Sequence, residues 1–216
     1  MSKKLIILDL DGTLLNTIDD LAIAANHALQ QMGFPTHPVS AYPFFVGNGV
    51  KRLLERVLPP EHQNEDTVQQ LRQHFAHYYD AHLTVNTRPY DGIMTMLDSL
   101  NSRGIALAVA SNKYHSAVVE IINHYFSHLS WVAVEGQKDQ YPPKPHPAIV
   151  HDILSKHPTE IGNVLYIGDS GVDMDTAANA GIESVGVTWG FRPVDELRQH
   201  NASHIIDTPD QLLDLI

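Results

Sequence analysis

The sequence predicts an α/β protein, a three-layer, Rossmann-like core with a parallel sheet, interrupted by an inserted all-α cap domain. Short apolar runs alternate with helical patterns from residue 88 onward, a matching run stands near the N-terminus, and the residues between show helical periodicity alone. Strands buried on both faces read as continuous apolar runs, and their alternation with helices indicates parallel strands joined by crossovers. A chain of 216 residues has room for one sizeable domain with such an insert.

The first strand is expected at residues 5–8, where the sequence reads LIIL. The helical segment after it begins with Thr17 and Asp20, which have the spacing of a capping box. A helical stripe then runs to about Gly33 and is made by Leu21, Ala25, Ala28 and Leu29. These features predict an amphipathic helix, and residues 15–87 as a whole are expected to be helical, with no strand.

Two further helices are expected before the chain returns to the sheet. The apolar stripe at 50–58 ends at two prolines, and another helical pattern runs from about residue 64 to residue 82. The sequence TRPYDG at 87–92 has the turn chemistry of a return hinge. The predicted domains are therefore a core and a helical cap, formed by residues 1–14 with 88–216 and by residues 15–87.

Four more strands are expected in the core, each an apolar run flanked by helical patterns. They are IALAVA at 105–110, WVAV at 131–134, VLYIG at 164–168 and SVGVT at 184–188. Parallel strands need long crossover connections, and the helical patterns between these runs supply them. We expect the strand near the N-terminus to join the later four in one parallel sheet.

The bulk composition excludes several classes of function. A net charge of −11 argues against a nucleic-acid or anionic-membrane binder, because both need a basic surface. The absence of cysteine excludes thiol catalysis and disulfide bonds. No stretch approaches the roughly 20 apolar residues that a membrane span needs. We expect a cytoplasmic monomer or homodimer with no nucleic-acid or membrane partner.

Polar motifs stand where the expected strands end. Asp9 and Asp11 follow the first strand, SNK at 111–113 follows the second, and GDSGVD at 168–173 includes the end of the fourth. The motif KPHP, which begins with Lys144, lies between the last two. Ligands of open parallel sheets bind outside the carboxyl ends of the strands. Carboxylates, a hydroxyl and a lysine are therefore expected to converge on one rim.

The motifs DLDGT, SNK, KPHP and GDSGVD, in that order, resemble those of the haloacid dehalogenase superfamily of phosphotransferases. The resemblance covers nearly the whole chain, including a helical cap inserted after the first motif. Asp11 favours phosphate esters, because the dehalogenases and phosphonate-cleaving members lack an aspartate there. The segments VGNGVKRLLERVL at 46–58 and VTWGFRPVDEL at 187–197 are similar to the bacterial phosphoglycolate phosphatases.

The resemblance implies roles for the two acids after the first strand. Asp9 is the expected nucleophile, which attacks phosphorus to form an aspartyl-phosphate. Asp11 is expected to protonate the leaving oxygen and later to deprotonate the hydrolytic water.

An acidic rim needs a cation to hold a phosphorylated metabolite, and Mg²⁺ suits carboxylate, phosphate and water oxygens. The resemblance implies Asp9, Asp169 and the backbone carbonyl of Asp11 as ligands. Asp173, one helical turn further on, is expected to hold metal-bound water or to orient Lys144.

The phosphoryl group itself is expected to be bound by the remaining motifs. Ser111 and the following backbone amide, that of Asn112, would donate hydrogen bonds, and Lys144 would neutralise the charge.

Specificity is expected to come from the cap. Gly47, Asn48 and Gly49 directly precede a predicted helix, and free N–H groups at a helix N-terminus favour anions. Lys51 or Arg52, in the first turn, would grip a second anion of the substrate, such as a carboxylate. The alternative is that GNG is an ordinary turn and Lys51 a solvated side chain.

These observations predict a magnesium-dependent phosphatase for small phosphate monoesters, with 2-phosphoglycolate as the leading substrate. A phosphomutase of the β-phosphoglucomutase type and a pyrophosphatase stay open, since the core handles only the phosphoryl group. A non-catalytic binding module is the competing class, and it would be expected to lack the nucleophile, a metal ligand or the lysine. None of these is missing.

Overall fold

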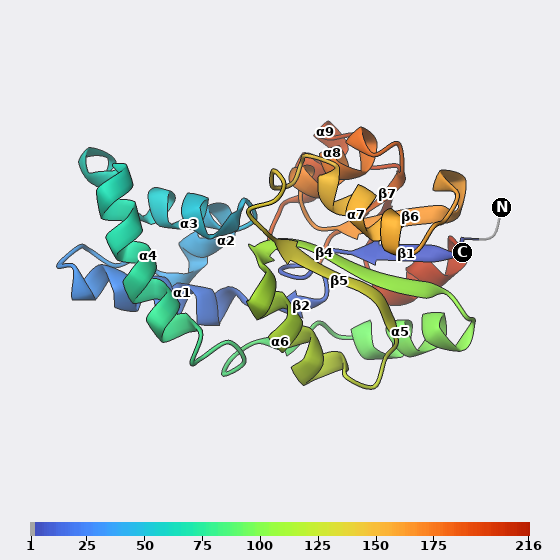
Figure 1. The fold of residues 1–216 in the computed structure, drawn as a ribbon, viewed down its shortest axis with the longest axis horizontal. Coiled ribbons are helices and arrows are strands. Elements are labelled where there is room, and N and C mark those ends of the chain that lie inside the picture. The colour runs from blue at the N-terminus through green and yellow to red at the C-terminus, as the bar shows by residue number, and fades with distance from the viewer. Residues whose placement is uncertain (1–2) are drawn as a thin grey trace.

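The computed structural model describes residues 3–216, which contain a six-stranded sheet with all neighbouring strands parallel (Figure 1). Its strands are β1 (Leu5–Leu8), β4 (Ala106–Tyr114), β5 (Trp131–Gln137), β6 (Val164–Gly168), β7 (Glu183–Val187) and β8 (His204–Ile206). Their order is β5-β4-β1-β6-β7-β8, so the chain winds in opposite directions on the two sides of β1. The predicted parallel core is confirmed, and its topological switch point lies beside β1. Strand β8 is not predicted, because three residues are too few to form a pattern.

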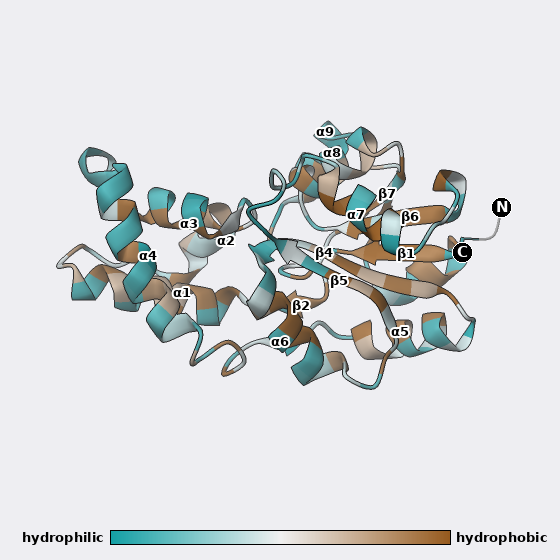
Figure 2. Ribbon diagram, in the orientation of Figure 1, coloured by the Kyte–Doolittle hydropathy of each residue, from teal (hydrophilic) through white to brown (hydrophobic). Residues whose placement is uncertain are grey.

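Both faces of the sheet are covered, as the apolar run of β1 requires. Ile6 and Leu8 belong to one buried apolar cluster, and Leu5 and Ile7 belong to a second. The covering helices and turns are α5 (Ile93–Ser102), α6 (His115–Phe126), α7 (Ala148–Lys156), η3 (Ile161–Asn163), α8 (Gly171–Asn179), α9 (Val194–Gln199) and η4 (Pro209–Asp214). Helices α5 and α6 pack in the first cluster, α7 and α8 in the second, and the strands between them are strongly hydrophobic (Figure 2).

Residues 15–87, here called the cap segment, place their helices together at one end of the molecule, beside the sheet (Figure 1). These elements are α1 (Ile18–Gln31), η1 (Val39–Ala41), α2 (Tyr42–Phe45), α3 (Gly49–Val57), η2 (Pro60–His62) and α4 (Glu65–Tyr79). Helix α4 begins where predicted because the Asn64 side chain accepts a hydrogen bond from the Thr67 N–H at 3.0 Å. Across residues 3–216, no helix has the length and apolar character to cross a membrane. The division of the chain into two domains stays a prediction.

The two connections between the cap segment and the sheet differ from the prediction. The chain forms a short antiparallel ribbon there, in which β2 (Leu15–Asn16) pairs with β3 (Arg88–Pro89), so the expectation of no strand in this segment is wrong. The capping box is also wrong. The Thr17 hydroxyl donates to Asp11 Oδ1 at 2.7 Å, and the Asp20 carboxylate accepts hydrogen bonds from Asn86 and Thr87. Long-range partners have replaced the local cap.

Candidate active site

The end of β1 supplies the first two acids. Asp9 is buried, its N–H donates to Ile167 O of β6 at 2.9 Å, and its Oδ1 accepts from the Leu10 N–H at 2.7 Å. Gly12 follows with φ of +87°, and a Cβ there would lie 2.3 Å from Asp169 Oδ2. Only glycine gives both the left-handed turn and the close approach of the β1 loop to Asp169.

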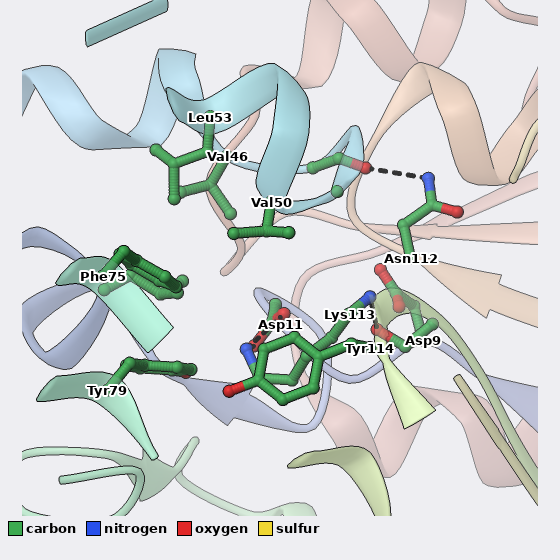
Figure 3. Close-up of a pocket in the computed structure, with 14 residues that line it drawn as sticks. Asp9, Asp11, Val46, Val50, Leu53, Phe75, Tyr79, Asn112, Lys113 and Tyr114 are labelled. Atoms are coloured by element: carbon green, nitrogen blue, oxygen red, sulfur yellow. Dashed lines mark hydrogen bonds and ion pairs between the residues drawn. The ribbon is translucent and has the colours of Figure 1, made fainter. Parts of the chain in front are cut away.

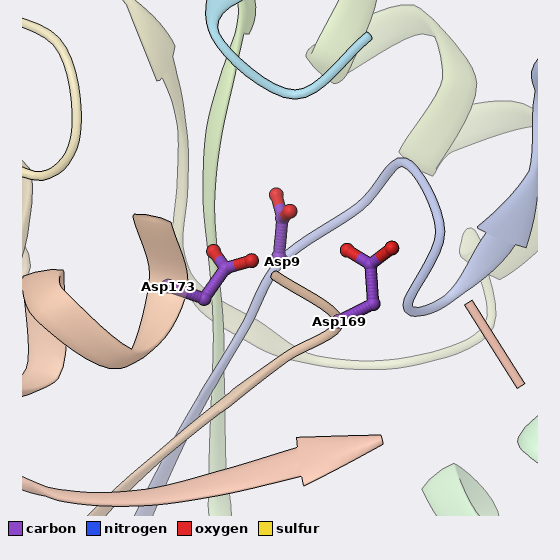
Figure 4. Close-up of side chains that lie close together, drawn as sticks. All are labelled: Asp9, Asp169 and Asp173. Atoms are coloured by element: carbon purple, nitrogen blue, oxygen red, sulfur yellow. The ribbon is translucent and has the colours of Figure 1, made fainter. Parts of the chain in front are cut away.

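The end of β6 and the start of α8 supply two more acids. Asp173 is fully buried at the third position of α8, where its Oδ2 accepts from the Ser170 N–H at 3.2 Å as part of a capping box. The same oxygen also accepts from the Ser170 hydroxyl at 2.6 Å. Asp169 Oδ2 accepts from the Phe191 N–H at 2.7 Å. One carboxylate oxygen each from Asp9, Asp169 and Asp173 lie within 4.8 Å of one another (Figure 4). The structure thus brings Asp9 together with two acids that lie 160 or more residues further along the chain.

Lys144 is the buried cation of this cluster. Its Nζ lies 2.7 Å from Asp173 Oδ1 and 3.0 Å from Asp9 Oδ1, and it also donates to Ala110 O at 3.0 Å and to the Tyr166 hydroxyl at 3.1 Å. Burial alone would lower the pKa of Lys144, but the charges of Asp173 and Asp9 outweigh it and raise that pKa well above its usual value. Lys144 therefore stays charged beside Asp9.

One lysine does not compensate the acids. Burial, followed by repulsion from Asp173, raises the pKa of Asp9 to about 7. Burial and the charges of Asp173 and Asp9 likewise raise the pKa of Asp169 well above its usual value. A set of buried carboxylate oxygens that resist ionisation together fits a hard divalent cation, which would favour their charged forms. The part of the Asp11 backbone carbonyl in such a site stays a prediction.

Strand β4 brings the SNK residues to the same edge. The strand continues through these residues to Tyr114, beyond the predicted end at residue 110, with a register shift against β5. Ser111 is buried and lines the pocket described below. The Asn112 side chain accepts from the Lys144 N–H at 2.8 Å and donates to Lys144 O and Gly47 O, each at 3.2 Å. Asn112 therefore joins the lysine loop to the cap segment.

A small pocket lies between this edge of the sheet and the cap segment (Figure 3). Its free volume is about 40 Å³. Asp9, Asp11 and the SNK residues line the core side. The cap side is largely apolar and includes Val46, Val50, Leu53, Phe75 and Tyr79. The pocket therefore offers room for a small group above the acids.

The predicted cap residues fall in two places. Gly47 and Gly49 line the pocket, and Asn48 Oδ1 accepts from an Arg56 N–H at 2.8 Å. Lys51 Nζ lies 2.7 Å from Glu65 with 54% of its side chain exposed. Arg52 lies 2.7 Å from Glu55 with 66% exposed, and neither cation is among the residues that line the pocket. The binding of a second substrate anion by Lys51 or Arg52 stays a prediction.

Lys113 and Tyr79 are among the pocket residues that the sequence-based prediction does not include. Lys113 Nζ lies 3.0 Å from both oxygens of Asp11, and it sits 5.1 Å from the centre of the Tyr79 ring. Lys113 could have been found, since it is the last residue of SNK at a predicted strand end. Tyr79 carries no such signal, because a buried tyrosine on a helical stripe reads as core.

A parallel α/β sheet with acids and a lysine gathered at the switch point has the arrangement of an enzyme active site. The chain belongs to the haloacid dehalogenase-like hydrolase family, whose model matches residues 6–187. This confirms the family and the enzyme class predicted from the motifs.

Similar proteins span the whole chain. The phosphoglycolate phosphatase of Vibrio parahaemolyticus is 31% identical over 219 residues, which cover 99% of this chain and 96% of the relative. That of Haemophilus influenzae is 32% identical over 224 residues, covering 99% and 98%. A solved structure described as a predicted phosphoglycolate phosphatase from Haemophilus somnus has a TM-score of 0.92 at 29% identity, covering 100% of this chain and 98% of that one.

Proposed function

We propose that this protein is a magnesium-dependent phosphatase for small phosphate monoesters, with 2-phosphoglycolate as the leading substrate, acting through an aspartyl-phosphate. The observation that supports this most is the setting of Asp9 in the pocket, between Lys144 and the carboxylate of Asp169. The names of the relatives support the choice of substrate. The proposal places the enzyme in the cytoplasm, as a monomer or homodimer that acts on a small phosphorylated metabolite.

The two oxygens of Asp9 are not equivalent. Oδ1 is engaged by the Leu10 N–H and by Lys144, whereas Oδ2 has no hydrogen-bond partner among residues 3–216. We therefore assign Oδ2 as the attacking atom. Its lone pair forms the new bond to phosphorus, the bond from phosphorus to the ester oxygen breaks, and the electron pair leaves with that oxygen.

Asp11 faces the same pocket and would handle the protons. It gives a proton to the leaving oxygen, and it later takes one from the water that cleaves the acyl-phosphate. The Thr17 hydroxyl at 2.7 Å and Lys113 at 3.0 Å hold its carboxylate in place. Positioned acid–base help of this kind is worth about 100- to 10,000-fold in rate.

The remaining groups would hold the phosphoryl oxygens. Ser111 and the Asn112 N–H donate to them, and Lys144 supplies a positive charge. Mg²⁺, held by Asp9 and Asp169 with Asp173 behind, would neutralise charge on the phosphoryl group.

The pocket volume bears on the alternatives left open by the motifs. The pocket is small, with about 40 Å³ of free space, and this supports a short ester such as 2-phosphoglycolate. A phosphomutase would also need room for its sugar phosphate to present a second oxygen to the same centre. We therefore keep a phosphatase for short esters as the proposal, and the assay below separates it from the mutase.

A phosphate-release assay tests the proposal. The substrates are 2-phosphoglycolate, ethyl phosphate, glucose 1-phosphate and pyrophosphate, each with Mg²⁺, with Ca²⁺ or after exhaustive chelation. We expect release from the short esters with Mg²⁺ only, and near-background rates for Asp9→Asn. Hydroxylamine should trap an acyl-phosphate in the wild type but not in Asp9→Asn. Asp98→Asn, an exposed aspartate on α5, is the matched control and should behave as wild type.

Three results would contradict the proposal. Full turnover after chelation would show that the reaction needs no metal. A trapped acyl-phosphate in Asp9→Asn would show that Asp9 is not the nucleophile. Isomerised sugar phosphate without free phosphate would establish the mutase instead.

A further inference from the structure

We propose that Lys113 and Tyr79 form a second-anion subsite that selects phosphate esters with a carboxylate close to the ester oxygen. This inference rests on the proposed phosphatase function, and it names which residues read the rest of the substrate. Figure 3 shows the two side chains approaching each other across the pocket, Lys113 from the sheet and Tyr79 from α4.

Lys113 is a buried cation with donor capacity left over. Its side chain is only 4% exposed. An ammonium group carries three N–H donors. Among residues 3–216, its only hydrogen-bond acceptor is the Asp11 carboxylate, at 3.0 Å to each oxygen. An anion in the pocket could thus bind Lys113 while Asp11 keeps its contact.

Tyr79 supplies an independent observation. Tyr79 is 0% exposed and lines the pocket. Its hydroxyl has no hydrogen-bond partner among the described residues. Buried hydroxyls are nearly always paired, so an unpaired hydroxyl on a residue that lines the pocket points to a ligand that can accept its hydrogen bond. The Lys113 Nζ lies over the Tyr79 ring, 5.1 Å from its centre, so the ammonium group and the ring are neighbours in the pocket lining.

The geometry limits how far that anion lies from the reacting centre. Asp11, as acid, must reach the leaving oxygen by a hydrogen bond of about 2.6–3.2 Å. Lys113 Nζ is 3.0 Å from the same carboxylate. An anion bound to Lys113 would therefore lie close to the leaving oxygen, as the carboxylate of a short ester such as 2-phosphoglycolate does.

The surroundings favour a carboxylate over other groups. The rest of the cap wall is apolar, formed by Val46, Val50, Leu53 and Phe75. In such a setting a charge–charge contact is strong, and a bare anion is unfavourable without one. The free volume of about 40 Å³ leaves room for a group as small as a carboxylate.

The structure separates this assignment from the predicted cap cations. Lys51 and Arg52 are more than half exposed and already paired with Glu65 and Glu55. Reaching the pocket would require both pairs to break. Lys113 needs no such change.

The test compares two esters that differ only at the second anion, 2-phosphoglycolate and ethyl phosphate. The readout is the ratio of their kcat/KM values. We expect Lys113→Gln to lower this ratio about 10- to 100-fold and Tyr79→Phe to lower it about 3- to 10-fold, as expected for a charged and a neutral hydrogen bond. Lys113→Arg should keep most of the ratio. Lys4→Gln, an exposed lysine far from the pocket, is the matched control.

A binding measurement makes the result independent of turnover. Calorimetry with 3-phosphonopropionate and propylphosphonate compares ligands with and without the carboxylate, neither of which can be hydrolysed. Wild type should bind the first more tightly, and Lys113→Gln should remove the difference. Circular dichroism of each variant shows whether it is folded. If Lys113→Gln does not fold, Tyr79→Phe is used for the same comparison.

The failures are distinguishable. If wild type hydrolyses both esters equally well, or if Lys113→Gln leaves the ratio unchanged, the subsite is wrong and the phosphatase stands. If Lys51→Gln or Arg52→Gln lowers the ratio instead, the second anion binds at the cap cations. If wild type hydrolyses no ester, the proposed function is wrong, and the phosphonate binding data alone decide the subsite.

Discussion

Asp20 holds both ends of the cap segment together, and replacing it by asparagine tests that role. Its carboxylate is buried at the start of α1, with 3% of the residue exposed. It accepts from the Thr87 N–H and Thr87 hydroxyl, both at 2.8 Å, and from the Asn86 side chain at 2.8 Å. The Asn86 N–H lies 2.9 Å and 3.0 Å from its two oxygens. One side chain thus satisfies the backbone where the chain leaves the cap segment.

The expected cost follows from those contacts. Asp20→Asn keeps one acceptor oxygen but turns the other into an NH₂ group that faces N–H donors. Hydrogen bonds to a charged group are worth about 1.5–3 kcal/mol, and a buried donor left unpaired costs about 1–3 kcal/mol. Because Asn86 is exposed, water can replace part of the loss there. We expect a loss of about 2–4 kcal/mol, which is a fall in Tm of roughly 5–15 °C for a chain of this size.

Thermal and urea unfolding of the metal-free protein measure this change. Asp19→Asn is the matched control, because the neighbouring Asp19 is 39% exposed and its nearest cation, on Arg88, is 3.9 Å away. It should stay within about 0.5 kcal/mol of wild type. If Asp20→Asn is no less stable than Asp19→Asn, the contacts of Asp20 do not hold the segment.

Three further predictions concern the site and its approach. Mg²⁺ should raise Tm more at pH 8 than at pH 5. Burial raises the pKa of Asp9 to about 7 and also raises that of Asp169, so the metal-free fold loses stability as these acids ionise between pH 5 and pH 8, and the ionised acids are the forms that bind metal. An increase in Tm that is the same at both pH values would contradict the site. Gly12→Ala should lower Tm and abolish phosphate release, because its Cβ would lie 2.3 Å from an oxygen of Asp169 at φ of +87°; an active, stable variant would refute the close approach. Arg192→Ala removes a 2.8 Å hydrogen bond to the backbone carbonyl of Val46 in the cap segment and should speed proteolysis of that segment several-fold. Arg198→Ala, at an exposed arginine, is the control, and equal proteolysis rates for the two variants would show that the Arg192 bond does not hold the cap segment.

Many features of the fold and of the site can be predicted from the local sequence. The four apolar residues of β1 alternate between two buried clusters, as a strand covered on both faces requires. Once the later strands are placed in the same parallel sheet, their carboxyl ends must share one edge, so the amino-acid sequence alone predicts that Asp9, Asp169 and Lys144 meet. The local sequence shows that each acid stands just after a strand. That the acids meet follows from the topology of the parallel sheet.

The errors have a common cause. Thr17 and Asp20 fit the spacing of a capping box, yet their side chains bond to Asp11 and to the far end of the cap segment. A local pattern records which partners are near in sequence, while a hydrogen bond forms with whichever buried group would otherwise be unpaired. Asp20 and Asn86 lie 66 residues apart, beyond the reach of any periodic signal.

The rest of the site was decided by how the cap segment packs on the sheet. Lys51 and Lys113 are equivalent in the sequence as cations beside motifs, but one is exposed and paired with Glu65 and the other is buried in the pocket. Tyr79 reads as a core residue of α4, and only its unpaired hydroxyl sets it apart. Burial and pairing depend on contacts between segments that are remote along the chain, so tertiary structure alone determines which cation and which hydroxyl face the substrate.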